Sequence, residues 1–291
     1  MKYLKPPKCL TFKLEKMKNI LQLIAVLFVC AFLSSCKKHH DLINNSITYD
    51  VDAQKFIDSS GLSDTTQKMA INNFVKQLKD SSLWTKFVAV YPMVGGTTTT
   101  TKWNLKDPRN LDVAYRLTFY GTPVYANTGV LFPTTSDYAD THLADSAIGG
   151  YINASISYYS RTQNTISGYD MGCTDGSGPY NELSVYSNAA DNSEWFGFSQ
   201  NILSANTIGL FMLSSSATTV TRYRNGVVVS SKGSAPNNSY TNLTILVGKS
   251  RVTAHPGQKE CALVTIGNGL TAAQALTFYN IVQNFETTLG R

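Results

Sequence analysis

The feature that most limits the fold of this chain is a two-residue alternation of apolar and polar side chains. It runs through residues 111–120 and 152–159, with Gly, Asn, Pro and Ser clusters in between. A period of two is typical of a β-strand with one buried face. Further short strand-like runs follow at 182–187, 194–199, 207–214, 218–224, 227–231, 243–248 and 259–267. Many short strands separated by turns predict a mainly β protein, a two-sheet antiparallel jelly-roll sandwich.

One turn can be predicted from the residues themselves. Asn225-Gly226 separates two apolar runs. Both central positions of a type I′ turn require a positive φ, which Asn and Gly tolerate best. We therefore expect a tight hairpin here.

Helical periodicity marks both ends of the globular part. We expect a helix at 52–60 that ends at Gly61, and a second one capped by Ser63 or Asp64. A third helix begins at the capping box formed by Thr271 and Gln274. Apolar stripes predict the buried faces of the second and third helices: Ile71, Phe74, Val75 and Leu78, then Phe278, Val282, Phe285 and Leu289. Trp84 and Phe87 should pack into the same cluster.

The positive charge of the chain lies mostly at its start. The formal net charge is +6, but residues 1–36 hold six Lys and a single acid, Glu15. The rest of the chain has 19 basic and 18 acidic residues. Such a balance gives no support for nucleic-acid binding.

A 14-residue apolar run at 20–33 follows the basic Met17-Lys18-Asn19. A membrane span needs about 20 residues, so this run has the length of a secretory signal. It ends in Leu33-Ser34-Ser35-Cys36, which resembles the lipobox of bacterial lipoproteins. The resemblance implies a signal peptide at 1–35, a lipid on Cys36, a polar tether at 36–51, and a place in the bacterial cell envelope.

The true start of the leader and the state of the thiols stay open. Met17 would give a leader of ordinary length, so either Met1 or Met17 can be the start. Outside the leader, two cysteines remain, Cys173 and Cys261. They form one disulfide or stay as two small buried thiols.

The C-terminal half resembles concanavalin A-like, laminin-G-like domains. The resemblance lies in the order of hairpin Tyr223–Val227, Leu246-Val247-Gly248, strand Cys261–Ile266 and helix start Leu270–Ala275. The stretches 89–97 and 104–109 are similar to a largely uncharacterised family of bacterial surface and tailed-phage virion proteins. The resemblance covers about 52–291. It implies a lectin- or glucanase-type sandwich at 104–291, with a helical segment at 52–103 packed on it, and implies no settled activity.

Motifs for catalysis are missing from the sequence. Glucanases of this fold would place acids in an E-x-D-x-E run on one strand, and the four Glu after the leader have no such neighbours: Glu182, Glu194, Glu260 and Glu286. There is no G-x-S-x-G motif, and His142 and His255 stand alone in loop-like contexts. We predict no catalytic residue.

Two sets of residues are candidates for binding. Outward aromatic, amide and guanidinium groups can hold a sugar, which points to Asn153, Tyr159 and Arg161, extended by Tyr186 and Trp195. The oxygen-rich loop 167–182 could bind calcium through Asp170, Asp175 and Glu182, or be an ordinary surface loop. If the helices cover the sheet face, we expect binding at the loops instead.

The sequence therefore favours a lipid-anchored, non-catalytic surface module that binds a glycan or another surface component. The alternative is a structural or assembly protein that presents a protein–protein interface. A glycoside hydrolase is the least favoured hypothesis.

Overall fold

The computed structural model describes residues 48–148, 153–174, 181–183, 193–195, 198–200, 205–216, 219–233, 240–251 and 257–291. The chain divides into two units, Met1–Thr48 and Tyr49–Arg291, and the second contains both sheets. The predicted signal peptide and Cys36 lie outside the described residues. Within the described ranges, no helix is both long and apolar enough to span a membrane.

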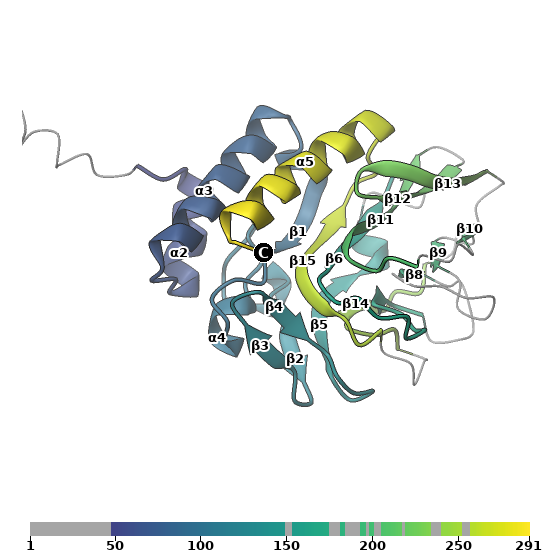
Figure 1. The fold of residues 1–291 in the computed structure, drawn as a ribbon, viewed down its shortest axis with the longest axis horizontal. Coiled ribbons are helices and arrows are strands. Elements are labelled where there is room, and N and C mark those ends of the chain that lie inside the picture. The colour runs from purple at the N-terminus through teal and green to yellow at the C-terminus, as the bar shows by residue number, and fades with distance from the viewer. Residues whose placement is uncertain are drawn as a thin grey trace, which may run out of the picture. The chain divides into compact units, whose positions relative to one another are not determined.

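Two antiparallel sheets form the fold (Figure 1). Sheet A has the order β13 (Val227–Gly233), β12 (Thr219–Arg224), β11 (Gly209–Ser216), β6 (Ser155–Ser160), β15 (Glu260–Gly267), β4 (Gly129–Leu131) and β3 (Val124–Ala126), and β1 (Phe87–Tyr91) also pairs with β15. Sheet B has the order β10 (Phe198–Gln200), β9 (Ser193–Trp195), β8 (Glu182–Leu183), β7 (Met171–Gly172), β14 (Thr244–Val247), β5 (Tyr138–Ala144) and β2 (Thr118–Tyr120). The predicted mainly β, two-sheet class is confirmed.

An apolar core fills the space between the sheets. Ile156 and Val264 face it from sheet A, and Leu143 and Val247 face it from sheet B, all with no exposed surface. Alternate residues of each strand point to opposite faces. The apolar members of the second alternating run, Ala154, Ile156 and Tyr158, therefore lie between the sheets, as expected.

A layer of helices covers the other face of sheet A (Figure 1). It comprises α2 (Val51–Ser60), α3 (Thr65–Asp80) and α5 (Ala272–Thr288). Together with sheet A these helices form a second apolar cluster, here called the helical core, in which the ring centroids of Phe87 and Phe278 are 4.9 Å apart. Sheet A is thus buried on both faces, and all six residues of β6 are buried.

The predicted helix boundaries agree with the structure because local capping bonds set them. Gly61 ends α2 with a φ of 67°. The Asp64 carboxylate accepts a hydrogen bond from Gln67 N at 2.8 Å, so Asp64 caps α3. Thr271 and Gln274 form the predicted reciprocal capping box of α5. The Asn225-Gly226 hairpin is also confirmed, with φ values of 50° and 75°.

The strand predicted over 111–120 is mostly wrong. Residues Asp112–Ala114 form a 3₁₀ turn and Tyr115 has a φ of 60°, so only Thr118–Tyr120 extends as β2. The Tyr115 carbonyl accepts a hydrogen bond from the Tyr91 hydroxyl at 2.6 Å, which holds the bend. Val113, predicted to face the core, is 74% exposed. A long-range contact overrides the local alternation here.

The remaining short elements were not predicted. They are α4 (Thr98–Thr101), the 3₁₀ turns Trp84–Lys86 and Asp145–Ala147, and strands β1, β3, β4, β5 and β7. Cys173 and Cys261 are both free and buried. Burial raises the pKa of both thiols, which leaves them as packing residues.

Candidate functional site

The structure separates the residues that the sequence grouped as a sugar site. Tyr159 is only 6% exposed and lies in the helical core. The Asn153 side-chain oxygen accepts a hydrogen bond from Gly269 N at 3.0 Å, and Arg161 Nε lies 4.0 Å from a Glu260 carboxylate oxygen. Trp195 belongs to β9 of sheet B, and Tyr186 falls outside the described residues. The helices cover the β6 face on which Tyr159 lies, which is the case in which the sequence led us to expect binding at the loops.

Two of the predicted metal ligands, Asp170 and Glu182, are buried inside the protein. Asp170 lies 3.6 Å from the ammonium of Lys259, and neither side chain is exposed. Glu182 is buried on β8, and Asp175 is outside the described residues. Within the described part of the chain, no three metal-ligating side chains come together. A calcium ion in the 167–182 loop stays a prediction.

The second sheet has an outer face that the helices do not cover. Ala139 and Leu143 of β5 face the inter-sheet core, so the alternating positions Tyr138, Asp140 and His142 face outward. Register places Thr118 opposite Asp140 and Tyr120 opposite Tyr138. We call this surface the outer face of sheet B; it comprises Thr118, Tyr120, Tyr138, Asp140, His142 and Thr244, with Lys249 and Arg251 from the loop after β14.

Two tyrosines form an aromatic platform on this face. The rings of Tyr120 and Tyr138 are stacked with centroids 4.7 Å apart and planes 12° from parallel. The Lys249 ammonium lies 4.2 Å from the centroid of the Tyr138 ring. Tyr120 is 42% exposed. An exposed ring next to charged and hydroxyl groups is the chemistry of a binding surface.

A buried carboxylate holds the loops beside this platform. Asp137 accepts hydrogen bonds from Thr122 N at 2.5 Å and from Thr134 N at 2.8 Å. Burial acts to raise the pKa of Asp137, but these hydrogen bonds and that of the Thr134 hydroxyl outweigh it, and the pKa is lowered. The strand ends that carry Tyr120 and Tyr138 are thereby tied together.

Arg251 connects Asp140 of β5 with Thr244 of β14 in the middle of this face. Its guanidinium lies 3.4 Å from an Asp140 carboxylate oxygen, and its Nε donates to the Thr244 carbonyl at 3.2 Å. It also contacts the Thr244 hydroxyl. The other Asp140 oxygen accepts from His142 N at 2.8 Å. This network fixes a row of polar groups along β5 and β14.

A hollow of about 360 Å³ adjoins the row and is lined by Asp112, Val113, Tyr115, His142 and Thr244. His142 Nε2 lies 2.8 Å from the Thr118 hydroxyl and 3.5 Å from Asp112. The prediction that His142 is a loop residue is wrong, since it belongs to β5. The alternation of Tyr138, Asp140 and His142 with smaller or apolar residues is the signal that could have placed it.

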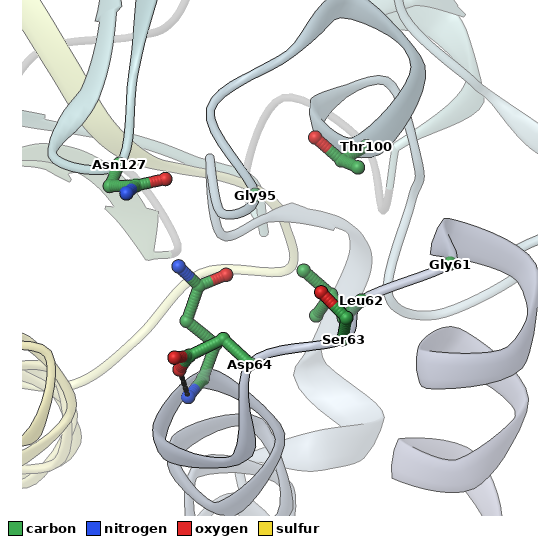
Figure 2. A pocket seen from close by; sticks show the side chains of 8 residues that line it. Gly61, Leu62, Ser63, Asp64, Gly95, Thr100 and Asn127 are labelled. Carbon is green, nitrogen blue, oxygen red and sulfur yellow. Dashed lines mark hydrogen bonds between the residues drawn. The ribbon is translucent and has the colours of Figure 1, made fainter.

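A second pocket, of about 230 Å³, lies among three connecting loops (Figure 2). Figure 2 shows Ser63 and Asp64 from the α2–α3 turn opposite Thr100 and Asn127. Asp64 is engaged as the cap of α3, and the pocket has hydroxyl and amide groups with no aromatic ring in its lining. It is therefore the weaker candidate for a ligand that stacks.

Comparisons with known proteins give no family. No family model matches the chain, and no curated protein matches it. Domain 4 of AbnA, a GH43 extracellular arabinanase from Geobacillus stearothermophilus in complex with arabinotriose, is similar at 14% identity and a TM-score of 0.45, over 66% of this chain and 98% of that one.

Two further solved structures are also similar, and in these the matched region is a smaller share of the other chain. The binding domain of Paraclostridial Mosquitocidal Protein 1 is 13% identical with a TM-score of 0.45, over 68% of this chain and 52% of that one. The Trypanosoma rangeli sialidase in complex with sialic acid is 8% identical with a TM-score of 0.43, over 72% and 38% of the two chains. Likeness at TM-scores below 0.5 carries no argument about function, and the fold class rests on the two sheets themselves.

Proposed function

We propose that this protein is a lipid-anchored, non-catalytic surface module that binds a glycan through the outer face of sheet B. The observation that carries the proposal is the stacked Tyr120–Tyr138 pair on the sheet face that the helices leave uncovered. Aromatic rings offer a flat apolar surface to the C–H face of a sugar. Calcium bound by the 167–182 loop is a compatible addition.

The groups beside the platform suit sugar hydroxyls. Thr118, His142 and Thr244 offer hydroxyl and imidazole groups that can donate or accept, and Arg251 offers a guanidinium. They lie along neighbouring strands of one sheet. An extended saccharide can therefore lie across the strands and contact several of these groups together.

Binding fits this face better than hydrolysis does. A glycosidase needs one carboxylic acid that donates a proton and a second carboxylate. Asp112 is paired with Arg116 at 2.8 Å, and Asp140 is paired with Arg251 at 3.4 Å. Both carboxylates of this region are therefore already engaged by guanidinium groups.

The test is a glycan array probed with the full chain in detergent micelles and with the Tyr120→Ala variant. We expect a defined set of glycans, and a loss of affinity of about tenfold, or about 1.4 kcal/mol, for the variant. Leu276→Ala, an exposed position on α5, is the control and should bind normally. Absence of any bound glycan, or equal binding by Tyr120→Ala, would contradict the proposal.

A second candidate function is an assembly role, favoured by the exposed strand β13. This strand ends the described order of sheet A, and Val227 and Val228 are 62% and 47% exposed. Exposed apolar edge strands pair with other chains unless they are protected. Light scattering should then show a dimer of the full chain that Val228→Lys converts to a monomer; a monomeric wild type would remove this candidate.

A further inference from the structure

We infer that the glycan bound by the outer face of sheet B carries carboxylate groups, as a uronic-acid polymer does, and that the Lys249 ammonium receives one of them. The inference rests on the proposed function and names its ligand class. Three features of the face support it: the pairing of its charges, the position of Lys249 and the charge density of the surface.

Among the described charged groups of this face and of the hollow beside it, arginines and acids are paired, and Lys249 has no acidic partner. Arg116 pairs with Asp112 and Arg251 pairs with Asp140. Within the described ranges, no carboxylate lies within ion-pair distance of Lys249. Its ammonium donates to the Thr135 carbonyl at 3.1 Å. An ammonium has three donors, so two remain for a ligand.

Lys249 is also held at a fixed place beside the platform. The Thr135 carbonyl and the Tyr138 ring, 4.2 Å from the ammonium to the ring centroid, keep the side chain in position. Burial and then the nearby Arg251 lower the pKa of Lys249, so a bound anion would stabilise its charged form. A sugar stacked on Tyr120 would bring a carboxylate on the same or the next ring to Lys249.

The mixture of acidic and basic groups on this surface favours a glycan with one carboxylate per sugar over a glycan with several sulfates per sugar. Asp140 lies on the same face as Lys249 and Asp112 lines the hollow beside it, and each of these acids is paired with one cation. A polymer with several sulfates per sugar would meet these acids as well as the lysine and be repelled by them. A single negative charge on each sugar matches one available ammonium.

The experiment compares polygalacturonate with its carboxyl-reduced, neutral form, using the full chain in detergent micelles and calorimetry. We expect the acidic polymer to bind about tenfold more tightly, as for one hydrogen-bonded ion pair, and less tightly as salt rises. Lys249→Met should remove this preference, and Lys249→Arg should keep most of it. Lys232→Met, an exposed lysine on β13, is the matched control and should bind as the wild type does.

The outcomes separate the inference from the function it rests on. Equal binding of the neutral polymer with no effect of Lys249→Met would overturn the inference and leave glycan binding intact. Tighter binding of dextran sulfate would overturn the choice of carboxylate. Failure of every polymer and every arrayed glycan to bind would overturn both. Circular dichroism of each variant verifies that it is folded.

Discussion

The outer faces of the two sheets differ in whether helices bury them. On β6 the outward residues Ser155, Ser157 and Tyr159 are buried beneath helices, whereas on β5 the outward Tyr138, Asp140 and His142 are only partly buried. Both strands alternate in the same way. The alternation therefore shows which residues face the inter-sheet core, and it does not show whether the opposite face is covered.

The residue types on the two faces explain the difference. The Ser157 hydroxyl bonds the Thr265 hydroxyl on the neighbouring strand at 2.6 Å, so a buried polar group is satisfied within the sheet. Asp140 needs a charged partner, and it finds Arg251 at a position that is still open to water. The Ser157 hydroxyl can thus be covered at little cost, whereas the Asp140–Arg251 pair keeps partial access to water.

The covered side should be the more sensitive to truncation. Phe278→Ala on α5 removes a fully buried ring that packs against Phe87, so we expect the free energy of unfolding to fall by about 3–5 kcal/mol. Urea denaturation measures this. Leu276→Ala on the same helix is 47% exposed and should change it by less than about 0.5 kcal/mol. Similar values for the two variants would mean that the helical layer is not tightly packed.

Tyr159 distinguishes the sequence-predicted site from the structural one. Because its ring lies in the helical core, Tyr159→Ala should lower the free energy of unfolding by about 2–4 kcal/mol. Tyr159→Phe keeps the ring and should be nearly as stable as the wild type. The folded Tyr159→Phe protein should bind glycans with unchanged affinity. A loss of affinity would mean that the glycan binds at the helix-covered face of sheet A instead of the outer face of sheet B.

The smallest effect concerns a buried ion pair beneath the helices. Glu286 and Arg291 are 2.7 Å apart with no exposed side-chain surface, and Arg291 also donates to the carbonyls of Pro92 and Ala262. Burial raises the pKa of Glu286 above its ordinary 4.5, although Arg291 opposes the shift. The folded state therefore binds this proton more tightly than the unfolded state does.

A raised pKa in the folded state means that the contribution of Glu286 to stability is fully present below pH 4.5 and declines as pH rises toward the folded-state pKa. Glu286→Gln cannot titrate, so the stability difference between wild type and variant should move in favour of the variant across that range. Thermal unfolding at a series of pH values measures it. A difference that does not change with pH, or that moves in favour of the wild type, would show that Arg291 outweighs burial.

Much of the fold could be predicted because its signals are local. Asp64, Gly61 and Thr271 set helix ends through bonds to residues within four positions, and Asn225-Gly226 sets a turn through its own φ values. The candidate site could not be predicted in this way. Tyr120, Tyr138 and Lys249 are far apart in the sequence and meet only through strand pairing and the loop after β14.

By itself, the sequence determined α2, α3 and α5, the Asn225-Gly226 hairpin and the side of β6 that faces the inter-sheet core, because capping, turn geometry and side-chain alternation act over a few residues. Tertiary structure alone decided that the helices cover sheet A. It thereby placed Tyr159 in a core and left the outer face of sheet B uncovered by α2, α3 and α5. The reason is that covering a face depends on whether distant apolar stripes, here those of α3 and α5, find a matching surface to bury.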